Sequence, residues 1–168
     1  MTSDRWVNWV SVIDFKSCYL CKNNNGKIRS KWERWPNYPP VHNKCRCAIV
    51  RMKALLAGTA TDMGTNGADW YLKYLKRLPP YYISKLSATY KGWISKLFNL
   101  AEVAPGKMIG GDRYYNDNNK LPSNSYRKWY EADINYTGGM RNTQRILYSN
   151  DGLIFVTYDH YTTFIEII

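Results

Sequence analysis

The second half of the chain alternates between polar and apolar positions in short runs, a pattern typical of β-strands. The strands are predicted at residues 107–113, 127–136, 143–149, 153–158 and 162–167. Turn-forming residues join the last four of them, at Gly138-Gly139, Asn150-Asp151-Gly152 and Asp159-His160-Tyr161. Connections this short join neighbouring antiparallel strands, so the pattern predicts a meander of hairpins.

Helical spacing comes before these strands. Residues 68–77 place their larger apolar side chains on one face, and Pro79-Pro80 ends the segment. A second helix is predicted over 85–92 with Ser84 as its N-cap, and a short third one is predicted to begin at Asn99. The order of elements predicts an α+β fold, with helices packed on an antiparallel β-sheet.

The first 55 residues show a different pattern. They are rich in turn-forming residues, and only Ala48–Leu56 is continuous enough for a short helix or strand. A small, Gly-rich stretch at 56–66 indicates a linker. We therefore expect a loop-rich module over 1–55, a linker over 56–66 and an α+β domain over 67–168. So small a module buries little apolar surface and needs an added cross-link.

Four cysteines, all within the first 47 residues, can supply that cross-link. They are Cys18, Cys21, Cys45 and Cys47. Two closely spaced pairs of thiols suit a structural tetrahedral Zn²⁺ site, and His42 is a fifth candidate ligand. Which four residues bind is left open, and two disulfides are the alternative.

Composition and charge narrow the class of protein. The chain has 168 residues and a formal net charge of +11. No apolar run approaches the length of a membrane helix, and the N-terminus lacks the apolar core of a signal peptide. We expect no membrane partner, and any export to depend on a larger parent protein or a separate carrier. The charge favours a polyanionic partner, nucleic acid or an acidic protein, unless it only solubilises the surface.

Alternation along the strand at 127–136 separates two faces. Trp129, Glu131, Asp133 and Asn135 fall on one face, expected to be open, and Ala132 and its alternate neighbours face the core. If the following turn is centred on Gly138, Glu131 lies opposite Arg145 on the next strand.

A second set of polar groups lies near that face. Arg141 falls in the turn between the two strands, and His160 lies in the last tight turn. A carboxylate, an imidazole and several cations at adjacent strand ends can serve acid–base chemistry on phosphate esters. RNA suits this chemistry because its 2′-hydroxyl is an internal nucleophile, and no metal is needed. The alternative is a purely structural network of ion pairs.

Residues 67–168 resemble the barnase-like family of small extracellular guanyl-preferring bacterial ribonucleases. The matching stretches are Tyr82–Lys85, Asn99–Lys107, Tyr130–Thr137, Arg145–Ser149 and Thr157–Tyr161. They follow the family pattern without a gap over about 100 residues. The resemblance implies the microbial ribonuclease fold. It also implies a two-step endonuclease that forms a 2′,3′-cyclic phosphate and then hydrolyses it.

The resemblance also implies roles for single residues. Glu131 falls at the family's general base and His160 at its general acid. The positions that stabilise the phosphate are those of Lys85, Arg141 and Arg145. Supporting positions are those of Asp112, beside the lysine and glutamate, Asp133, paired with the two arginines, and Tyr161, flanking the substrate.

One loop departs from the family pattern. In the family, an Arg-Glu pair follows the Asn of the base-recognition loop, and its Glu accepts hydrogen bonds from guanine. Here Asn116 is followed by Asp117 and Asn118. Backbone amides near Asn116 can still hold a purine carbonyl, but a neutral Asn118 cannot supply the carboxylate. We predict relaxed or altered base choice; a shift of register that gives Asp117 the role of the Glu is the alternative.

The N-terminal segment resembles the Cys/His region near the C-terminus of phage minor head (head-morphogenesis) proteins. The residues that carry the resemblance are Cys18–Cys21 and Pro39–Cys47. Together the two resemblances imply a toxic ribonuclease carried or delivered by a larger assembly into a target cell, and an acidic barstar-like inhibitor or immunity protein. The alternatives are a structural phage component with a vestigial nuclease domain and a zinc-dependent nucleic-acid-binding protein.

Overall fold

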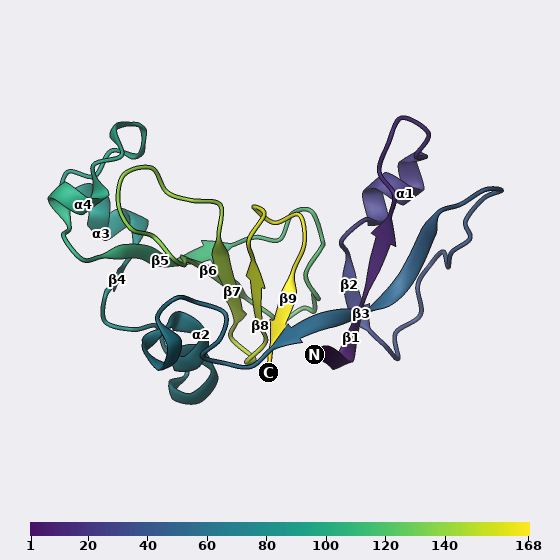
Figure 1. The fold of residues 1–168 in the computed structure, drawn as a ribbon, viewed down its shortest axis with the longest axis horizontal. Helices are drawn as coiled ribbons and strands as arrows, with labels where there is room; N and C mark the ends of the chain where they lie inside the picture. Colours follow the sequence, from purple (N-terminus) through teal and green to yellow (C-terminus); the bar gives the residue numbers. More distant parts are fainter.

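The computed structural model describes residues 1–168, and its strands form one nine-stranded sheet in the order β2-β1-β3-β9-β8-β7-β6-β5-β4 (Figure 1). The first three strands are β1 (Thr2–Ser11), β2 (Ile28–Ser30) and β3 (Cys47–Leu55). The others are β4 (Tyr82–Ile83), β5 (Met108–Tyr114), β6 (Trp129–Asp133), β7 (Arg145–Ser149), β8 (Ile154–Thr157) and β9 (Ile165–Ile167). The predicted mixture of helices and sheet is confirmed.

Strands β5 to β9 form the predicted antiparallel meander. The predicted pairing of β6 with β7 is wrong by two residues. Asp133 lies opposite Arg145, and Glu131 lies opposite Leu147. The paired residues are centred on Gly139 instead of Gly138. The loop between β6 and β7 is long, so the glycine pair alone does not fix its midpoint.

Short helices connect the strands. They are α1 (Tyr19–Asn24), α2 (Ala68–Trp70), α3 (Lys85–Tyr90) and α4 (Leu100–Val103), and α2 continues as a π-helical turn over Tyr71–Leu75. The Oγ of Ser84 accepts from the backbone N–H of Ser87 at 3.1 Å, so the predicted cap of α3 is confirmed. Asn99 does not cap α4, because its Oδ1 accepts from the N–H of Ile94 at 2.9 Å. None of the helices is long and apolar enough to serve as a membrane span.

The sheet buries side chains on both faces. Ala68 and Leu72 share one core cluster with Ala132, Ile146 and other strand residues. The expectation that the face of Trp129 and Asp133 is open is wrong, because these two residues are buried, with exposed fractions of 3% and 1%. Trp129 belongs to a second cluster. This cluster also contains Leu121, from the loop after β5, and Ile28 and Met52, from residues 1–55, which are called the N-terminal segment below. The N-terminal segment therefore helps to cover the face that was expected to be open.

The N-terminal segment is built from strands, which corrects the expected loop-rich module. β1 and β3 pair antiparallel along most of their length, and β3 then pairs parallel with β9 through Ala54 opposite Glu166. Figure 1 shows β3 running from β1 to the side of β9. Polar residues interrupt the apolar ones along β1, so its sequence shows no clear alternation that would predict a strand. Its Trp9 is nevertheless fully buried. One continuous sheet thus spans both predicted domains.

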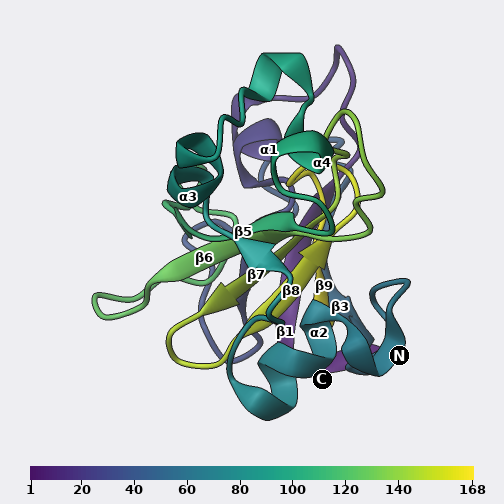
Figure 2. The ribbon, with the colours of Figure 1, turned by 90° about the vertical axis from the view of Figure 1, so that its left-hand side faces the viewer.

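The expected linker at 56–66 is tightly bonded to the rest of the fold. The carboxylate of Asp69 is fully buried and accepts from the backbone N–H groups of Gly58 at 2.7 Å and Ala60 at 2.9 Å. Ala60 itself is 3% exposed and belongs to the first core cluster. Figure 2 shows α2 at the opposite end of the strands from α3 and α4. This segment is therefore a fixed part of the structure instead of a free spacer.

Candidate active site

Glu131, on β6, lies at the centre of a group of polar side chains. Lys85, the first residue of α3, donates from Nζ to Oε1 of Glu131 at 2.7 Å. Tyr161, in the turn before β9, donates from its hydroxyl to Oε2 at 2.6 Å. The Glu131 side chain is 12% exposed, so both of its oxygens are held in fixed positions while one edge still meets solvent.

These partners determine the charge of Glu131. Burial alone would raise the pKa of this carboxyl, but the hydrogen bonds from Lys85 and Tyr161 and the charges of Lys85 and Arg145 outweigh it. The pKa of Glu131 is therefore below its usual value. At neutral pH the side chain is a carboxylate, the form that can accept a proton.

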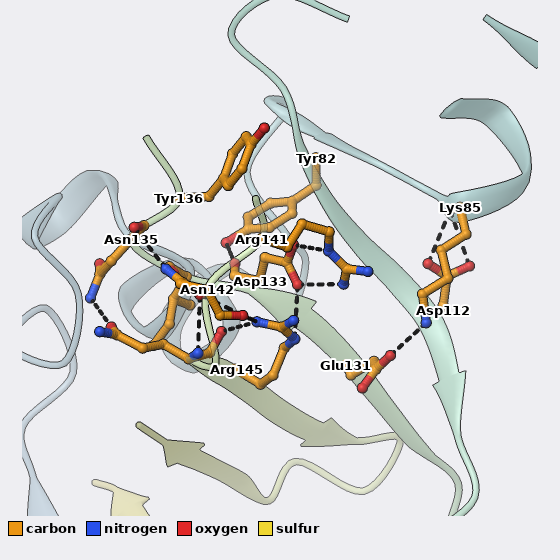
Figure 3. Close-up of polar contacts among 12 residues, drawn as sticks. Tyr82, Lys85, Asp112, Glu131, Asp133, Asn135, Tyr136, Arg141, Asn142 and Arg145 are labelled. Carbon is orange, nitrogen blue, oxygen red and sulfur yellow. Dashed lines mark hydrogen bonds and ion pairs between the residues drawn. The ribbon is translucent and has the colours of Figure 1, made fainter. Parts of the chain in front are cut away.

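Asp112 positions Lys85. The backbone N–H of Lys85 donates to both carboxylate oxygens of Asp112, at 3.0 and 3.3 Å, at the N-terminal end of α3. A bulge in β5, where Gly111 has a φ of +90°, places Asp112 opposite Glu131 on the neighbouring strand. Figure 3 shows Lys85 between the two carboxylates. Asp112 thus accepts from the main-chain N–H of Lys85, and the ammonium group of Lys85 is free to bind Glu131.

Asp133 gathers two arginines beside this group. Arg141 donates from Nε and Nη2 to the Asp133 carboxylate at 2.6 and 2.7 Å. Nε of Arg145 lies 2.9 Å from the same carboxylate at ion-pair distance, without hydrogen-bond geometry. Nη1 of Arg145 donates to the backbone oxygens of Asn142 and Gln144, both at 2.7 Å. Figure 3 shows both arginines converging on Asp133, two residues from Glu131 on β6.

His160 lies in the exposed turn between β8 and β9. His160 and Tyr161 adopt left-handed backbone conformations, with φ of 52° and 65°. Asp159 holds this turn, because its Oδ1 accepts from the N–H groups of Thr162 at 3.1 Å and Thr163 at 2.8 Å. The His160 ring lies 4.8 Å from the Tyr161 ring, centroid to centroid. Since Tyr161 is bonded to Glu131, one tyrosine contacts both the carboxylate and the imidazole.

Asn116 is buried inside the loop that follows β5. Its Nδ2 donates to the backbone oxygen of Leu121 at 2.9 Å, and its Oδ1 accepts from the N–H of the same residue at 3.0 Å. The side chain therefore closes the loop from within. Asp117 and Asn118 are exposed, and Oδ1 of Asn118 accepts from the N–H of Lys120 at 3.1 Å.

Two contacts of the site were not predicted from the sequence. The ring of Tyr114 stacks on that of Tyr161, with centroids 5.3 Å apart and planes at 20°. Lys120 donates from Nζ to the backbone oxygen of Tyr161 at 2.9 Å, which joins the loop after β5 to the turn of His160. Both contacts link residues more than forty positions apart, so no local pattern predicts them. The structure brings the predicted site residues of 67–168 into one region, apart from the buried side chain of Asn116.

The four cysteines and His42 gather in a separate cluster. The Sγ of Cys21 lies 3.4 Å from Sγ of Cys18, 3.9 Å from Sγ of Cys45 and 3.3 Å from Nε2 of His42. Two overlapping sets of ligand atoms form, one with Cys18, Cys21 and His42, the other with Cys21, Cys45 and Cys47. All four cysteines have free thiols. Cys21 belongs to both sets and is the buried one.

A carboxylate with nearby cations and an imidazole thus lie together on an antiparallel meander. Comparison with known proteins identifies the family of the chain. A family model described as ribonuclease matches residues 72–168, and the chain belongs to this family. Over 100 residues, or 60% of its length, this chain is 55% identical to a ribonuclease of Heyndrickxia coagulans. The match covers 91% of that protein. The same identity relates this chain to ribonucleases of Bacillus intermedius and Bacillus pumilus, of which the match covers 61%.

Proposed function

We propose that the chain is an endoribonuclease that cleaves single-stranded RNA by metal-independent transesterification. Glu131 takes the proton from the 2′-hydroxyl, whose oxygen then attacks the adjacent phosphorus. His160 gives a proton to the departing 5′-oxygen, and a 2′,3′-cyclic phosphate results. Water then opens the cyclic phosphate with the two roles exchanged. The lowered pKa of Glu131 supports its role as the base.

The cations can stabilise the negative charge that develops on the phosphate. Lys85 forms an ion pair with Glu131, and Arg141 and Arg145 form ion pairs with Asp133, two residues further along β6. Because Asp133 fixes the guanidinium groups before substrate binds, little reorganisation is needed when charge builds up on the phosphoryl oxygens. Tyr161 holds one Glu131 oxygen and leaves the other to Lys85.

The observation that carries the proposal is that Tyr161 contacts both groups: its hydroxyl donates to Glu131, and its ring lies 4.8 Å from the His160 ring, centroid to centroid. The test is cleavage of a labelled RNA oligonucleotide in the presence of EDTA, with the products separated by chromatography. We expect cleavage to persist and a 2′,3′-cyclic phosphate to accumulate before the 3′-phosphate. Products that carry 5′-phosphates, or rapid loss of cleavage on chelation, would contradict the mechanism.

Base choice is the second finer proposal. We expect cleavage after more than one base, because Asn118 offers an amide where a carboxylate would accept two guanine N–H groups. Asn118→Glu is expected to raise the preference for guanine by about tenfold to a hundredfold, the effect of one charge-assisted hydrogen-bonded pair. The measurement is kcat/KM for GpA, ApA, CpA and UpA, with Asn118→Gln as the matched neutral control. Strong, exclusive cleavage after guanine by the unaltered chain would contradict this proposal.

A toxin role follows from the same chemistry. An active ribonuclease degrades the RNA of its own producer, so we propose that the chain is a toxin delivered by a larger assembly. We further propose that an acidic, barstar-like inhibitor protects the producer. The net charge of +11 supports long-range attraction to such a partner. Toxicity on expression, relieved by a neighbouring gene for an acidic protein, is the observation to seek.

We also propose that the N-terminal cysteine cluster holds one structural Zn²⁺. Two thiolates on a tetrahedral zinc lie about 3.8 Å apart, given Zn–S bonds of about 2.3 Å. The Sγ separations from Cys21 of 3.4 Å to Cys18 and 3.9 Å to Cys45 fit that geometry. Nδ1 of His42 lies 2.7 Å from the backbone oxygen of Asn43, which leaves Nε2 facing Cys21. The ion would stabilise the fold and take no part in cleavage.

Removal of the ion tests this second site. Elemental analysis is expected to find one zinc per chain, and chelation to lower the melting temperature because binding free energy is part of the folding free energy. Cys21→Ser is expected to abolish zinc binding, since Cys21 belongs to both sets of ligands. The zinc affinities of His42→Ala and Cys47→Ser are then compared. The substitution that weakens zinc binding more identifies the fourth ligand. A zinc-free chain with an unchanged melting temperature would contradict the proposal.

A further inference from the structure

The N-terminal segment touches the loop after β5 and, through it, the turn of His160. The backbone N–H of Ile28 donates to the oxygen of Lys120 at 2.7 Å. Nζ of Lys120 donates to the backbone oxygens of Tyr161 at 2.9 Å and Thr162 at 3.2 Å. These contacts hold the N-terminal segment, the loop and the turn together as one packed unit.

Gly26 allows this close packing. Its φ is +81°, and a Cβ at this position would lie 2.9 Å from the backbone oxygen of Thr162. Ile28, two residues further on, is 4% exposed and shares a core cluster with Leu121 and Phe164. The N-terminal segment is therefore fixed against the proposed substrate site and cannot swing away from it without loss of core contacts.

A polar cavity of about 350 Å³ lies where the segment meets the loop. Its size is within the range of small-ligand sites, about 300–1,000 Å³. The lining residues from the N-terminal segment are Lys27, Ile28, Arg29 and Glu33. Those from the loop are Asn119, Leu121, Pro122 and Ser123. The loop residues directly follow Asn116–Asn118, the stretch that is proposed to face the base at the cleavage point.

The charges in this cavity favour an anion. Arg29 is paired with Glu33 and lies over the Trp35 ring at 5.1 Å, so its charge is already compensated. Nζ of Lys27 contacts only a neutral oxygen, Oδ1 of Asn24, at 3.2 Å. Burial and the nearby charge of Arg29 lower the pKa of Lys27. An anion in the cavity would relieve this unfavourable environment.

We propose that the cavity binds a second nucleotide of the RNA strand, beside the one held by the loop after β5. Lys27 would contact its phosphate, and the amide of Asn119, whose Nδ2 has only a 3.5 Å contact with the oxygen of Asp117, would contact its base or ribose. This inference rests on the proposed function, because it takes RNA as the substrate. It gives the N-terminal segment a role in substrate binding: longer RNA binds more tightly than a dinucleotide.

The experiment compares the binding of short and long ligands. Fluorescence anisotropy gives the Kd of a dinucleotide and of an octanucleotide, each with a 2′-deoxy sugar at the cleavage point so that binding is measured without cleavage. The variants are Lys27→Met, which keeps the length of the side chain, and Lys27→Arg, which restores the charge. Lys53→Met is the control, because Lys53 is an exposed lysine of β3 that does not line the cavity.

Lys27→Met is expected to weaken binding of the octanucleotide about fivefold to tenfold, the effect of one charge-assisted contact. The slope of log Kd against log salt is expected to fall by about 0.7, as for one phosphate contact on a single strand. Dinucleotide binding and both affinities of the Lys53→Met control are expected to stay within twofold. Lys27→Arg is expected to recover the affinity.

Two results would overturn the inference. One is equal weakening of both ligands, which would show that Lys27 acts only by holding the loop. The other is unchanged binding of the octanucleotide. If the chain binds the octanucleotide in this length-dependent way but does not cleave an all-RNA version, the proposed cleavage fails and the binding site stands.

Discussion

Replacing Glu131 with Gln is expected to lower kcat for RNA cleavage by about 10³-fold, within the range that general acid–base catalysis contributes. The amide keeps the size of the side chain but cannot take the proton of the 2′-hydroxyl. His160→Ala is expected to cause a loss of the same order, because the departing oxygen then lacks its acid. The measurement is single-turnover cleavage of a labelled oligonucleotide at saturating enzyme.

A control and a double variant sharpen this result. Glu102→Gln removes an exposed carboxylate of α4 and is expected to leave kcat unchanged. The Glu131→Gln, His160→Ala double variant is expected to lose much less than the product of the two single losses, because both groups act in one transition state. A kcat for Glu131→Gln within threefold of the unaltered chain would remove Glu131 from the mechanism.

The pH dependence follows from the lowered pKa of Glu131. Since the base is ionised above its pKa, kcat/KM is expected to fall on the acid side only as pH drops below the usual range of a glutamate. Lys85→Met removes a hydrogen bond and a charge that lower this pKa, so the acid limb is expected to move to higher pH. Loss of phosphate stabilisation alone would lower kcat without moving this limb.

The largest loss of stability is expected for Asp133→Ala. Asp133 is 1% exposed and neutralises Arg145, which is 5% exposed. Removing the carboxylate leaves a buried guanidinium without its counter-charge, which costs about 3–5 kcal/mol of the free energy of unfolding. Urea denaturation followed by tryptophan fluorescence measures this change.

A surface ion pair provides the comparison for Asp133. Asp151 pairs with Arg127 at 2.8 Å, and its side chain is 41% exposed. Asp151→Ala is expected to cost less than Asp133→Ala, because water reaches the position of this carboxylate and can replace it beside Arg127, whose side chain is 12% exposed. If Asp133→Ala costs no more than Asp151→Ala, then Arg145 finds other compensation and the carboxylate is not essential to the fold.

The sequence was sufficient to predict the meander, because turn residues such as Gly138-Gly139 and Asn150-Asp151-Gly152 separate runs of period two. It also predicted that Glu131 and His160 lie in one site, since the resemblance to a ribonuclease family spans the whole of that region. The family match over 72–168 agrees with the interpretation of this region as a ribonuclease. The individual roles of these residues stay predictions until variants are measured.

Other features depend on contacts that no local pattern records. The pairing of β6 with β7 differs from the prediction by two residues, because the loop between them is long enough to move its centre from Gly138 to Gly139. The bond from Tyr161 to Glu131 requires left-handed conformations at two successive non-glycine residues, which the sequence does not indicate. The strand β1 was missed because its alternation is irregular, and the parallel pair of β3 and β9 joins residues far apart in the chain.

The parallel pair of β3 and β9 also bears on solubility. With β3 in place, the main-chain N–H and C=O groups on that side of β9 have partners. A truncated chain that begins after residue 56 would expose this edge, a template on which another molecule can add a strand. Shortening the protein to its family-matched region would therefore invite self-association, and a recombinant fragment would need charged substitutions along β9 to stay monomeric.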